Sequence, residues 1–472
     1  MDESVGVLVT ALNAGEDWEA ALFEEVCRLA REWTSQVFEV LDVALYEQEG
    51  RALRVEACRS RVLLTRIGAI HVRRRLYRDG NRRRFLLDEV MGWDRAKVLS
   101  PSLQTLALGL VAELSYRKAA AVLGHLVSQS VSRMTLHRLV QTIGARTSEQ
   151  EAAARQGVYE AGEPAPSGLA AADPLFLEAD GVSIALQREP ERRTELKVAI
   201  AYAGSDKLSI DRHGQVRRAL TGKVSYAGLE PPKPFWESAW LTFRAKYDTR
   251  KTTRVIVNGD GASWIRGGLV GHRGLFQLDR FHLARELRRV LGPPGMAVFH
   301  ALRTGDDPEA KALLAGVWQE ATGDPARSEE LLALEGYISS NHDGLVDWYR
   351  RVDPAPSDPV PMGAMEANID KPYATRFKRR GMSWTKPGAH HLAKVLQLRA
   401  NGELERACRR PVRILPLPVS PLRRASAAST APRHTGLSEP AFQATIVARW
   451  GPHAARPWVQ ALCRLASEST IR

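Results

Sequence analysis

The stretch Val255-Ile256-Val257-Asn258-Gly259-Asp260-Gly261 decides the predicted fold. Three consecutive β-branched apolar residues are typical of a strand that is buried on both faces, and the run ends abruptly in an acid flanked by glycines. Upstream, the run from Leu175 to Leu186 follows the same plan, with Asp180 at its centre. The two runs predict neighbouring buried strands that each carry one carboxylate.

Asp180 and Asp260 are therefore the first candidates for a catalytic centre. Carboxylates at adjacent strand ends can approach closely enough to share a divalent metal ion, and Gly259 and Gly261 leave room for a substrate backbone. Each aspartate alone also has a purely structural interpretation, because Asp-Gly is a frequent turn pair. Two apolar strands that each carry an aspartate followed by glycine favour a catalytic role over a turn-forming one.

A two-metal site requires a third acid, since hard cations take oxygen ligands and keep open positions for water and phosphate. Glu366, within Pro361–Asn368, is the candidate, and Asp370 is its rival. The helix expected after Glu366 carries cations that would follow a phosphate path: Lys371, Arg376, Lys378, Arg379 and Arg380.

Two further strands are expected between the aspartates. The run from Leu196 to Tyr202 carries Lys197 and is predicted to bring it near the active site, and Trp240 to Phe243 is a candidate third strand.

The charge balance favours a polyanionic partner. The chain has 67 Lys and Arg against 54 Asp and Glu, a formal net charge of +13. The excess is concentrated in residues 51–84, with 12 Arg, and in residues 371–410, with 11 Lys and Arg. Two basic patches suit a protein that contacts DNA twice, although two solvated basic faces would give the same composition.

The N-terminal half is predicted to contain a helix, a hairpin and a helix pair. Apolar residues recur at helical spacing from Trp18 to Leu41, a stripe that is either packed on its own domain or is a dimer seam. Residues 61–87 read as a basic β-hairpin around Asp79-Gly80. This hairpin would place Arg73, Arg74 and Arg75 against phosphates, or would be an edge guarded by charge.

A helix-turn-helix is predicted over residues 103–140. The first helices reach Gly124, which is the expected turn, and Ser132 is the expected N-cap of the second helix. The side chains expected to enter the major groove are Arg133, His137 and Arg138. Helix pairs of this kind also occur in proteins that never contact DNA. Residues 151–173, rich in Gly, Pro and Ala, are expected to be a linker.

The remaining sequence signals concern compartment and membrane. Four widely spaced cysteines offer no CxxC spacing, which favours a reduced cytoplasmic protein. The short apolar segment from Val5 to Leu12 follows two acids and is not expected to be a signal peptide. No run approaches the ~20 apolar residues that span a bilayer.

Taken together, several motifs resemble a known family. They are Glu178-Ala179-Asp180-Gly181-Val182, Gly259 to Ile265, Leu278-Asp279-Arg280-Phe281-His282, Gly363-Ala364-Met365-Glu366 and Arg380-Gly381-Met382-Ser383-Trp384. The combination resembles the DDE-type transposases of bacterial insertion sequences, specifically the ISLre-two family, over about residues 60–405.

The resemblance implies an α/β fold, with an RNase H-like catalytic domain that a helical insertion interrupts. The catalytic and metal-binding residues would be Asp180 on the first strand, Asp260 after the fourth and Glu366 on the last catalytic helix, holding two Mg²⁺ or Mn²⁺ ions. The 106-residue interval from Asp260 to Glu366 is too long for a simple connection, so it is expected to contain the insertion.

Asp279 and His282 resemble a short acid-then-His signature near the active site of insertion-bearing transposases. Their spacing puts them on one helix face. A helix-capping aspartate and a satisfied histidine would produce the same pattern, so no metal is assigned to His282.

The expected domain order follows from these elements. It comprises an N-terminal helical region (1–60), the DNA-binding region (61–150), the linker (151–173), the catalytic domain (174–280 and 360–405), the helical insertion (281–359) and a Pro/Arg-rich tail (406–472). In the tail, residues 441–467 are expected to form a last short helix. Trp264, Trp348 and above all Trp384 are candidates to stack on an unpaired base, although most tryptophans are core residues.

The predicted function is DNA transposition. By resemblance, the enzyme would hydrolyse phosphodiesters at element ends and then join the freed 3′-hydroxyl to target DNA, working as a homodimer or larger oligomer in the nucleoid, away from membranes. The alternative is a catalytically inactive, transposase-derived DNA-binding protein that acts as a repressor.

Overall fold

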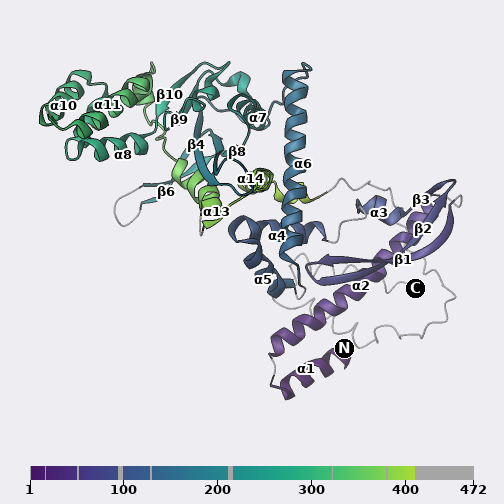
Figure 1. The fold of residues 1–472 in the computed structure, drawn as a ribbon. Coiled ribbons are helices and arrows are strands. Elements are labelled where there is room, and N and C mark those ends of the chain that lie inside the picture. The colour runs from purple at the N-terminus through teal and green to yellow at the C-terminus, as the bar shows by residue number, and fades with distance from the viewer. Residues whose placement is uncertain are drawn as a thin grey trace. The chain divides into compact units, whose positions relative to one another are not determined.

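The structure is a computed structural model that describes residues 2–15, 17–49, 53–93, 99–127, 130–210, 216–321, 323–378 and 381–409. The chain is a mixed α/β protein in which helices cover several sheets (Figure 1). Its described part forms two compact units. One comprises residues up to Ser60 with Val72–Met91, and the other comprises Arg61–His71 with residues 92–409. Within the described residues, no helix is long and apolar enough to cross a membrane.

The first unit is built from two N-terminal helices and a basic β-ribbon. Helices α1 (Asp2–Asn13) and α2 (Trp18–Glu49) precede a three-stranded sheet of β1 (Arg54–Thr65), β2 (Gly68–Asp79) and β3 (Arg82–Arg84), followed by α3 (Leu86–Met91). The sheet contains the predicted turn, because Asp79 pairs with Arg82 across Gly80, whose φ is +56°.

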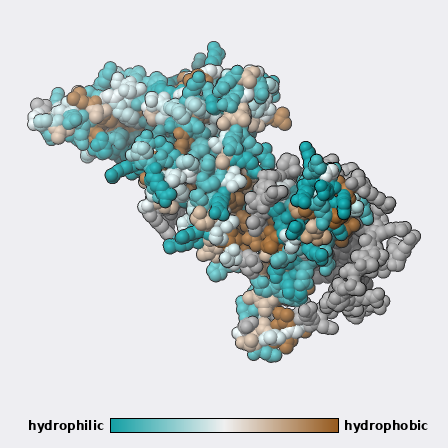
Figure 2. Space-filling view, turned by 45° about the vertical axis from the view of Figure 1, so that its right-hand side comes forward, coloured by the Kyte–Doolittle hydropathy of each residue, from teal (hydrophilic) through white to brown (hydrophobic). Residues whose placement is uncertain are grey.

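The apolar stripe on α2 lies at the surface. Its residues are 40–67% exposed, and they are Leu22, Val26, Leu29, Trp33 and Val37. In Figure 2, hydrophobic side chains are visible at the lower end of the molecule, where Figure 1 draws α1 and the start of α2. The first of the two predicted interpretations, packing of this stripe onto its own domain, therefore does not describe the observed surface.

A five-stranded sheet is the centre of the second unit. Its order is β10-β9-β4-β5-β8. β4 (Leu175–Ala185) pairs antiparallel with β5 (Arg193–Tyr202), which pairs antiparallel with β8 (Val224–Gly228). On its other side β4 pairs parallel with β9 (Val255–Gly259), and β9 pairs parallel with β10 (Gly274–Leu278). A small hairpin of β6 (Gly204–Ile210) and β7 (Val216–Thr221) joins β5 to β8.

Helices cover both faces of this sheet (Figure 1). One face, which includes Leu177 and Val257, packs against α7 (Pro232–Arg244). The other face, which includes Val182 and Val198, packs against α14 (Lys386–Ala400) and α4 (Pro101–Glu113). The predicted strand from Trp240 to Phe243 is wrong, since these residues lie in α7. The apolar residues there recur at helical rather than alternating spacing, at Phe235, Trp236, Ala239, Trp240 and Phe243.

The predicted helix-turn-helix differs from the observed helices. Gly124 lies inside α5 (Tyr116–Val127) instead of in a turn. Ser132 is confirmed as an N-cap, because its hydroxyl accepts the Thr135 amide at 3.1 Å, but the helix it starts, α6 (Arg133–Tyr159), is 27 residues long. α6 packs along α14, so tertiary contacts extend helix through 151–159, where a linker was expected.

Residues 280–345 are helical, as expected for the insertion. The helices are α8 (Arg280–Leu291), α9 (Gly295–Thr304), α10 (Asp307–Glu320), α11 (Pro325–Ser340) and α12 (His342–Leu345). The chain then enters a π-helical segment, η4 (Glu366–Ala374), and continues through α13 (Thr375–Lys378), α14 and α15 (Leu404–Cys408). The predicted tail, apart from its first residues, and the helix predicted over 441–467 lie outside the described residues.

Candidate active site

Three aspartates lie in a row across three neighbouring parallel strands. The β4–β9 register runs from Leu175 opposite Val255 to Glu178 opposite Asn258, and continuing it sets Asp180 beside Asp260. The β9–β10 register pairs Gly259 with Leu278, so the next position sets Asp260 beside Asp279. Neighbouring strands lie ~4.8 Å apart. The fold therefore gathers three carboxylates where β9 and β10 end, beside the middle of β4.

Backbone amides orient two of these carboxylates. Asp180 Oδ1 accepts the Gly181 amide at 2.7 Å, and Asp260 Oδ1 accepts the Ala262 amide at 2.9 Å. The turn after Asp260 depends on Gly261, whose φ is +97° and whose missing Cβ would lie 2.8 Å from the Asn341 side chain.

The insertion contacts this turn as well. The Tyr337 hydroxyl, on α11, donates to the Asp260 carbonyl at 2.9 Å. The backbone of the second predicted catalytic residue is thus held by the helical insertion, which is a contact that the sequence pattern does not reveal.

Asp279 is both a helix cap and the partner of His282. Its carboxylate accepts the His282 amide at 3.1 Å and lies 2.9 Å from His282 Nδ1. The ring nitrogen is the donor when Asp279 is ionised. Asp279 is thus a helix-capping residue, as one of the two sequence interpretations proposed. Its place after β10 also makes it a member of the aspartate row.

The electrostatics of the row are unusual for carboxylates. The pKa of Asp180 is raised to about 6. Burial is the largest cause and the charge of Asp260 adds to it, while the Gly181 amide and His282 act in the opposite direction. Burial would also raise the pKa of Asp279, but the hydrogen bonds from His282 outweigh it and the pKa is lowered. The bond to Asp279 raises the pKa of His282.

The donor set fits a hard divalent cation in part. Asp180 and Asp260 each use one oxygen to accept a backbone amide, and carboxylate oxygens are the ligands that Mg²⁺ and Mn²⁺ prefer. Among the side chains that the structure describes, no three Asp, Glu, His or Cys groups are placed to hold a metal ion. The side chains of Glu366 and its rival Asp370 lie outside the described part, while the backbone of both is in η4.

Glu178 is a buried acid to which the sequence assigned no role. It lies on the Asp180 face of β4, is 0% exposed, and accepts hydrogen bonds from the Tyr202 hydroxyl and the Asn258 amide. Burial raises its pKa to about 7. The signal that identifies it is its position two residues before Asp180, since alternate residues of a strand share a face.

Lys197, predicted near the active site, lies on the opposite face of the sheet. It pairs in register with Gly181, next to Asp180, so the alternation of side chains turns it away from the Asp180 carboxylate. Its ammonium group lies 3.7 Å from Glu195 and 5.8 Å from the centre of the Trp264 ring.

The residues predicted to contact DNA fall into different environments. On α6, Arg133 and Arg138 are exposed, whereas His137 is half-buried and packs edge-to-face on Tyr116, with 5.4 Å between the ring centres. On β2, Arg73 is exposed. Arg74 and Arg75 instead form ion pairs within their own unit, with Asp88 and Asp42 respectively.

The basic segment after Glu366 is partly buried, unlike the predicted phosphate path. Arg376 is 4% exposed, and its guanidinium donates to the Val111 carbonyl at 2.8 Å and lies 5.1 Å from the Trp384 ring. Lys378 is exposed. Arg379 and Arg380 lie outside the described residues.

The tryptophans proposed for base stacking are core residues. Trp264, Trp348 and Trp384 are 9%, 5% and 8% exposed. Their rings pack edge-to-face against neighbouring phenylalanine side chains, as core tryptophans do.

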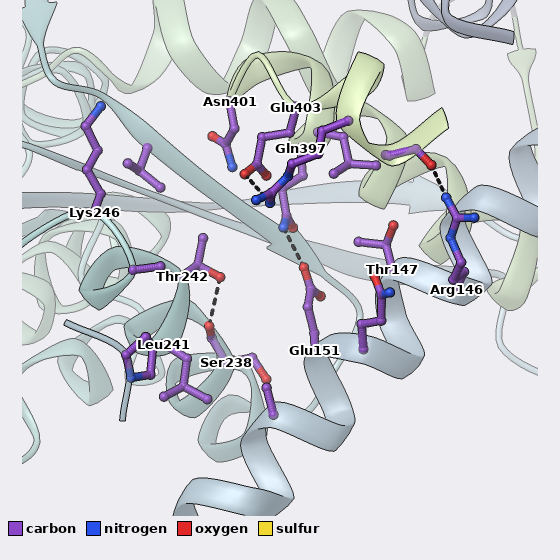
Figure 3. A pocket seen from close by; sticks show the side chains of 18 of the residues that line it. Arg146, Thr147, Glu151, Ser238, Leu241, Thr242, Lys246, Gln397, Asn401 and Glu403 are labelled. Atoms are coloured by element: carbon purple, nitrogen blue, oxygen red, sulfur yellow. Dashed lines mark hydrogen bonds and ion pairs between the residues drawn. The ribbon is translucent and has the colours of Figure 1, made fainter. Parts of the chain in front are cut away.

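The second unit contains a small cavity beside the aspartate row and a larger one elsewhere. A hollow of about 320 Å³ borders the aspartate row and is lined by Asp260 and by residues of α8 and α11, including His282, Arg285, Arg289 and Tyr337. A larger one of about 880 Å³ lies among α6, α7 and α14 and includes none of the three aspartates (Figure 3).

The polar side chains of the larger cavity are mostly committed to one another. Gln397 donates to Glu151 at 2.6 Å, Thr242 donates to the Ser238 carbonyl at 3.0 Å, and Arg146 donates to the Ala407 carbonyl (Figure 3). This arrangement is typical of helix packing. The smaller cavity is therefore the one that belongs to the candidate site.

Comparison with known proteins identifies relatives along most of the chain. A protein from Streptococcus gallolyticus named "UPF0236 protein in vanSb 3′region" is 25% identical over 342 residues, 71% of each chain. A UPF0236 protein from Caldanaerobacter subterraneus subsp. tengcongensis is 21% identical over 412 residues, 85% of this chain and 82% of its own. A third relative, 22% identical over 391 residues, has a name that joins many loci of that same organism.

The family model described as "Uncharacterised protein family (UPF0236)" matches residues 11–413, which is most of the chain. The chain therefore belongs to the uncharacterised protein family UPF0236.

Proposed function

We propose that this protein is a transposase of the DDE type, which cuts phosphodiester bonds at the ends of its element and joins the freed strand to target DNA. The observation that carries the proposal is the row of Asp180, Asp260 and Asp279 across three parallel strands. A protein that only binds DNA gains nothing from carboxylates that repel phosphate.

The topology supports an RNase H-like catalytic domain. The strand order β8-β5-β4-β9-β10, in which β5 runs antiparallel to the other four strands, corresponds to the 3-2-1-4-5 order of that fold. In this assignment Asp180 is on the first strand, Asp260 follows the fourth, and the helices after β10 are an insertion before the Glu366 segment.

The family supports a mobile element. One relative shares its name among many loci of a single genome. Repeated copies of nearly the same gene are what an insertion sequence leaves behind when it moves, whereas a housekeeping enzyme or a repressor is ordinarily present in few copies.

Asp180, Asp260 and Glu366 would hold two Mg²⁺ or Mn²⁺ ions. Such ions, when bound, lower the pKa of the attacking water and stabilise the leaving oxygen. Hydrolysis breaks the bond between phosphorus and the 3′-oxygen, forms a bond from phosphorus to the water oxygen and leaves a 3′-hydroxyl. That hydroxyl then attacks a target phosphate, and the target strand's own 3′-oxygen leaves.

The residues of the chain prepare the site for this reaction. The Gly181 and Ala262 amides fix the orientation of the Asp180 and Asp260 carboxylates before any substrate arrives. Asp279 directs the protonated Nδ1 of His282 toward itself, so the other ring nitrogen is left to accept or donate a proton at the cavity that Asp260 borders.

The test is a nicking assay on DNA that carries both flanks of the coding region. We expect Mg²⁺-dependent cutting by the wild type and loss of cutting in Asp180→Ala, Asp260→Ala and Glu366→Ala. Glu309→Ala, an exposed acid on α10, is the matched control and should cut normally. Normal cutting by Glu366→Ala would refute the third ligand. DNA binding without cutting by the wild type would favour the repressor.

A further inference from the structure

A carboxylate without contact to solvent lies two residues before Asp180. Glu178 is 0% exposed, and burying an ionised carboxylate is costly unless several donors satisfy it. The Tyr202 hydroxyl donates to Glu178 at 2.6 Å, and the Asn258 side-chain amide donates at 3.2 Å. These two donors come from the neighbouring strands of the same sheet, β5 and β9.

The other donors come from a distant part of the chain. The backbone amides of Gly363 and Ala364 each donate to Glu178 at 3.2 Å. They precede Glu366 by three and two residues, respectively. On β4, these amides are accepted by Glu178. Glu178 lies on the same face of the strand as Asp180, the first predicted catalytic residue.

Three further observations fix the same segment. Met365 is 3% exposed, and its sulfur lies 3.6 Å from the Asn258 amide nitrogen. Gly363 has a φ of +108°, a conformation that favours glycine, and a Cβ there would lie 3.7 Å from Asp279 Oδ1. Residues 363–365 therefore approach the aspartate row closely, and a larger residue at 363 would be strained.

Asn258 links the two ends of this network. Its amide nitrogen donates to Glu178 at 3.2 Å and to Asp279 at 3.1 Å. A continuous chain of contacts thus runs from Tyr202 through Glu178 and Asn258 to Asp279 and His282. Buried networks in which every member is satisfied hold their parts in one arrangement.

We propose that Glu178 is a positioning residue, whose buried carboxylate holds the Gly363–Ala364 backbone against β4 so that the helix carrying Glu366 begins beside Asp180 and Asp260. The proposal rests on the proposed function, because it takes Glu366 as the third metal ligand. Glu178 itself is not a ligand in this scheme, since all its oxygens face protein donors.

Glu178→Gln is the informative variant. It keeps the volume of the side chain but replaces one acceptor oxygen with an NH₂ group, which then faces either a backbone N–H or the Asn258 amide. Tyr202→Phe is the matched control. It removes one hydrogen bond to the same carboxylate and leaves the two backbone amides bonded.

The first measurement is amide hydrogen exchange at residues 361–368 in the metal-free full-length protein. We expect Gly363 and Ala364 to exchange about tenfold or more faster in Glu178→Gln than in the wild type, and to stay protected in Tyr202→Phe. Exchange elsewhere in β4 should be unchanged. Unchanged protection of Gly363 and Ala364 in Glu178→Gln would overturn the proposal.

The second measurement locates the metal without relying on activity. Fe²⁺ replaces Mg²⁺, and added hydrogen peroxide oxidises the bound Fe²⁺ to Fe³⁺, which releases hydroxide and a hydroxyl radical that cuts the backbone nearby. The wild type should be cut near Asp180, near Asp260 and at 363–367. In Glu178→Gln, the amount of cutting at 363–367 should fall about tenfold or more, and the cuts near Asp180 and Asp260 should remain. Wild-type cutting at 363–367 in Glu178→Gln would overturn the proposal alone, whereas a wild type without iron-dependent cuts would overturn the proposed function and the positioning role with it.

Discussion

The Asp279 carboxylate binds His282 twice, through the backbone amide at 3.1 Å and through the ring nitrogen Nδ1 at 2.9 Å. The pair combines helix capping with control of a histidine that borders the same cavity as Asp260. The first prediction follows from this double contact.

Replacing Asp279 with Asn should lower the pKa of His282. The hydrogen bond that His282 donates to Asp279, and then the negative charge of Asp279, are the largest causes that raise this pKa, and an amide supplies no charge. NMR titration of the histidine rings in metal-free protein measures the change, with the other histidines as internal references. A His282 pKa unchanged by Asp279→Asn would show that Asp180 and Asp260 suffice to raise it.

Replacing Asp180 with Asn should stabilise the metal-free protein at neutral and alkaline pH. Burial, and then repulsion by Asp260, raise the pKa of Asp180 to about 6, so the folded state binds its proton more tightly than the unfolded chain. Wild-type stability therefore falls as pH rises through 6, and Asn removes that loss, by about 1–3 kcal/mol. Urea unfolding in EDTA between pH 4 and 8 tests this. The free energies of unfolding of the wild type and Asp180→Asn should converge near pH 4. A lower free energy of unfolding for Asp180→Asn at pH 8 would contradict the prediction.

Stability should fall in acid because of His390, on α14. Burial, with the nearby Lys394, lowers its pKa to about 4, and its Nδ1 accepts the Leu229 amide at 3.3 Å. The folded pKa lies below the unfolded value of 6.5, so this stability is present above pH 6.5 and is lost as pH falls toward 4, by roughly 3 kcal/mol at most.

The check for His390 compares how steeply the free energy of unfolding changes with pH in the wild type and in His390→Gln. His390→Gln should be less stable at pH 7 but should lose less stability between pH 6.5 and 4 than the wild type does. Glu230, 3.9 Å from the ring, partly opposes the shift, so Glu230→Gln should lower the His390 pKa further. Equal slopes for wild type and His390→Gln would assign the acid sensitivity to other groups.

Removing the buried cation of α14 should be strongly destabilising. Lys394 is 0% exposed and lies 2.7 Å from Glu151, 3.5 Å from Glu230 and 3.8 Å from the centre of the Tyr226 ring. Lys394→Met leaves two carboxylates without their cation, which should cost about 3–5 kcal/mol in urea unfolding.

Lys386→Met, on the same helix, is the control. Lys386 is 44% exposed, and solvent screens its pair with Glu191, so its replacement should destabilise the protein far less than replacement of Lys394. An equal loss in the free energy of unfolding for Lys394→Met and Lys386→Met would contradict the prediction that Lys394 neutralises the buried carboxylates around it.

The α2 surface predicts a contrast between two residues of one helix. Trp33 is 67% exposed, so Trp33→Gln should change the free energy of unfolding by less than about 0.5 kcal/mol in dilute protein. Leu45 is 2% exposed, and Leu45→Gln should lower the free energy of unfolding by about 2–4 kcal/mol.

Sedimentation equilibrium at rising protein concentration tests whether the exposed stripe of α2 is a dimer seam. A dimer that Trp33→Gln weakens would support it, and an unchanged state would exclude Trp33 from any seam.

Local patterns predicted several elements because their signals are short-range. The apolar runs around Asp180 and Asp260 are strands, the spacing from Trp18 is a helix, and Gly80 lies in the predicted turn. Each depends on side-chain periodicity or on a backbone conformation that a few residues determine. The strand expected at Trp240 failed because a four-residue apolar run does not distinguish a strand from a buried helix.

The sequence by itself determined that the chain is an α/β protein with one acid inside a buried strand and another at the end of a second buried strand. Only the tertiary structure decided which other residues join them. Strand register placed Asp279 in the same row, and alternation turned Lys197 to the opposite face. Packing buried Arg376 and Trp384, and a contact across 185 residues made Glu178 the anchor of the Glu366 segment. Register and packing are set by pairings between distant parts of the chain, so no local pattern around Lys197, Arg376 or Glu178 encodes them.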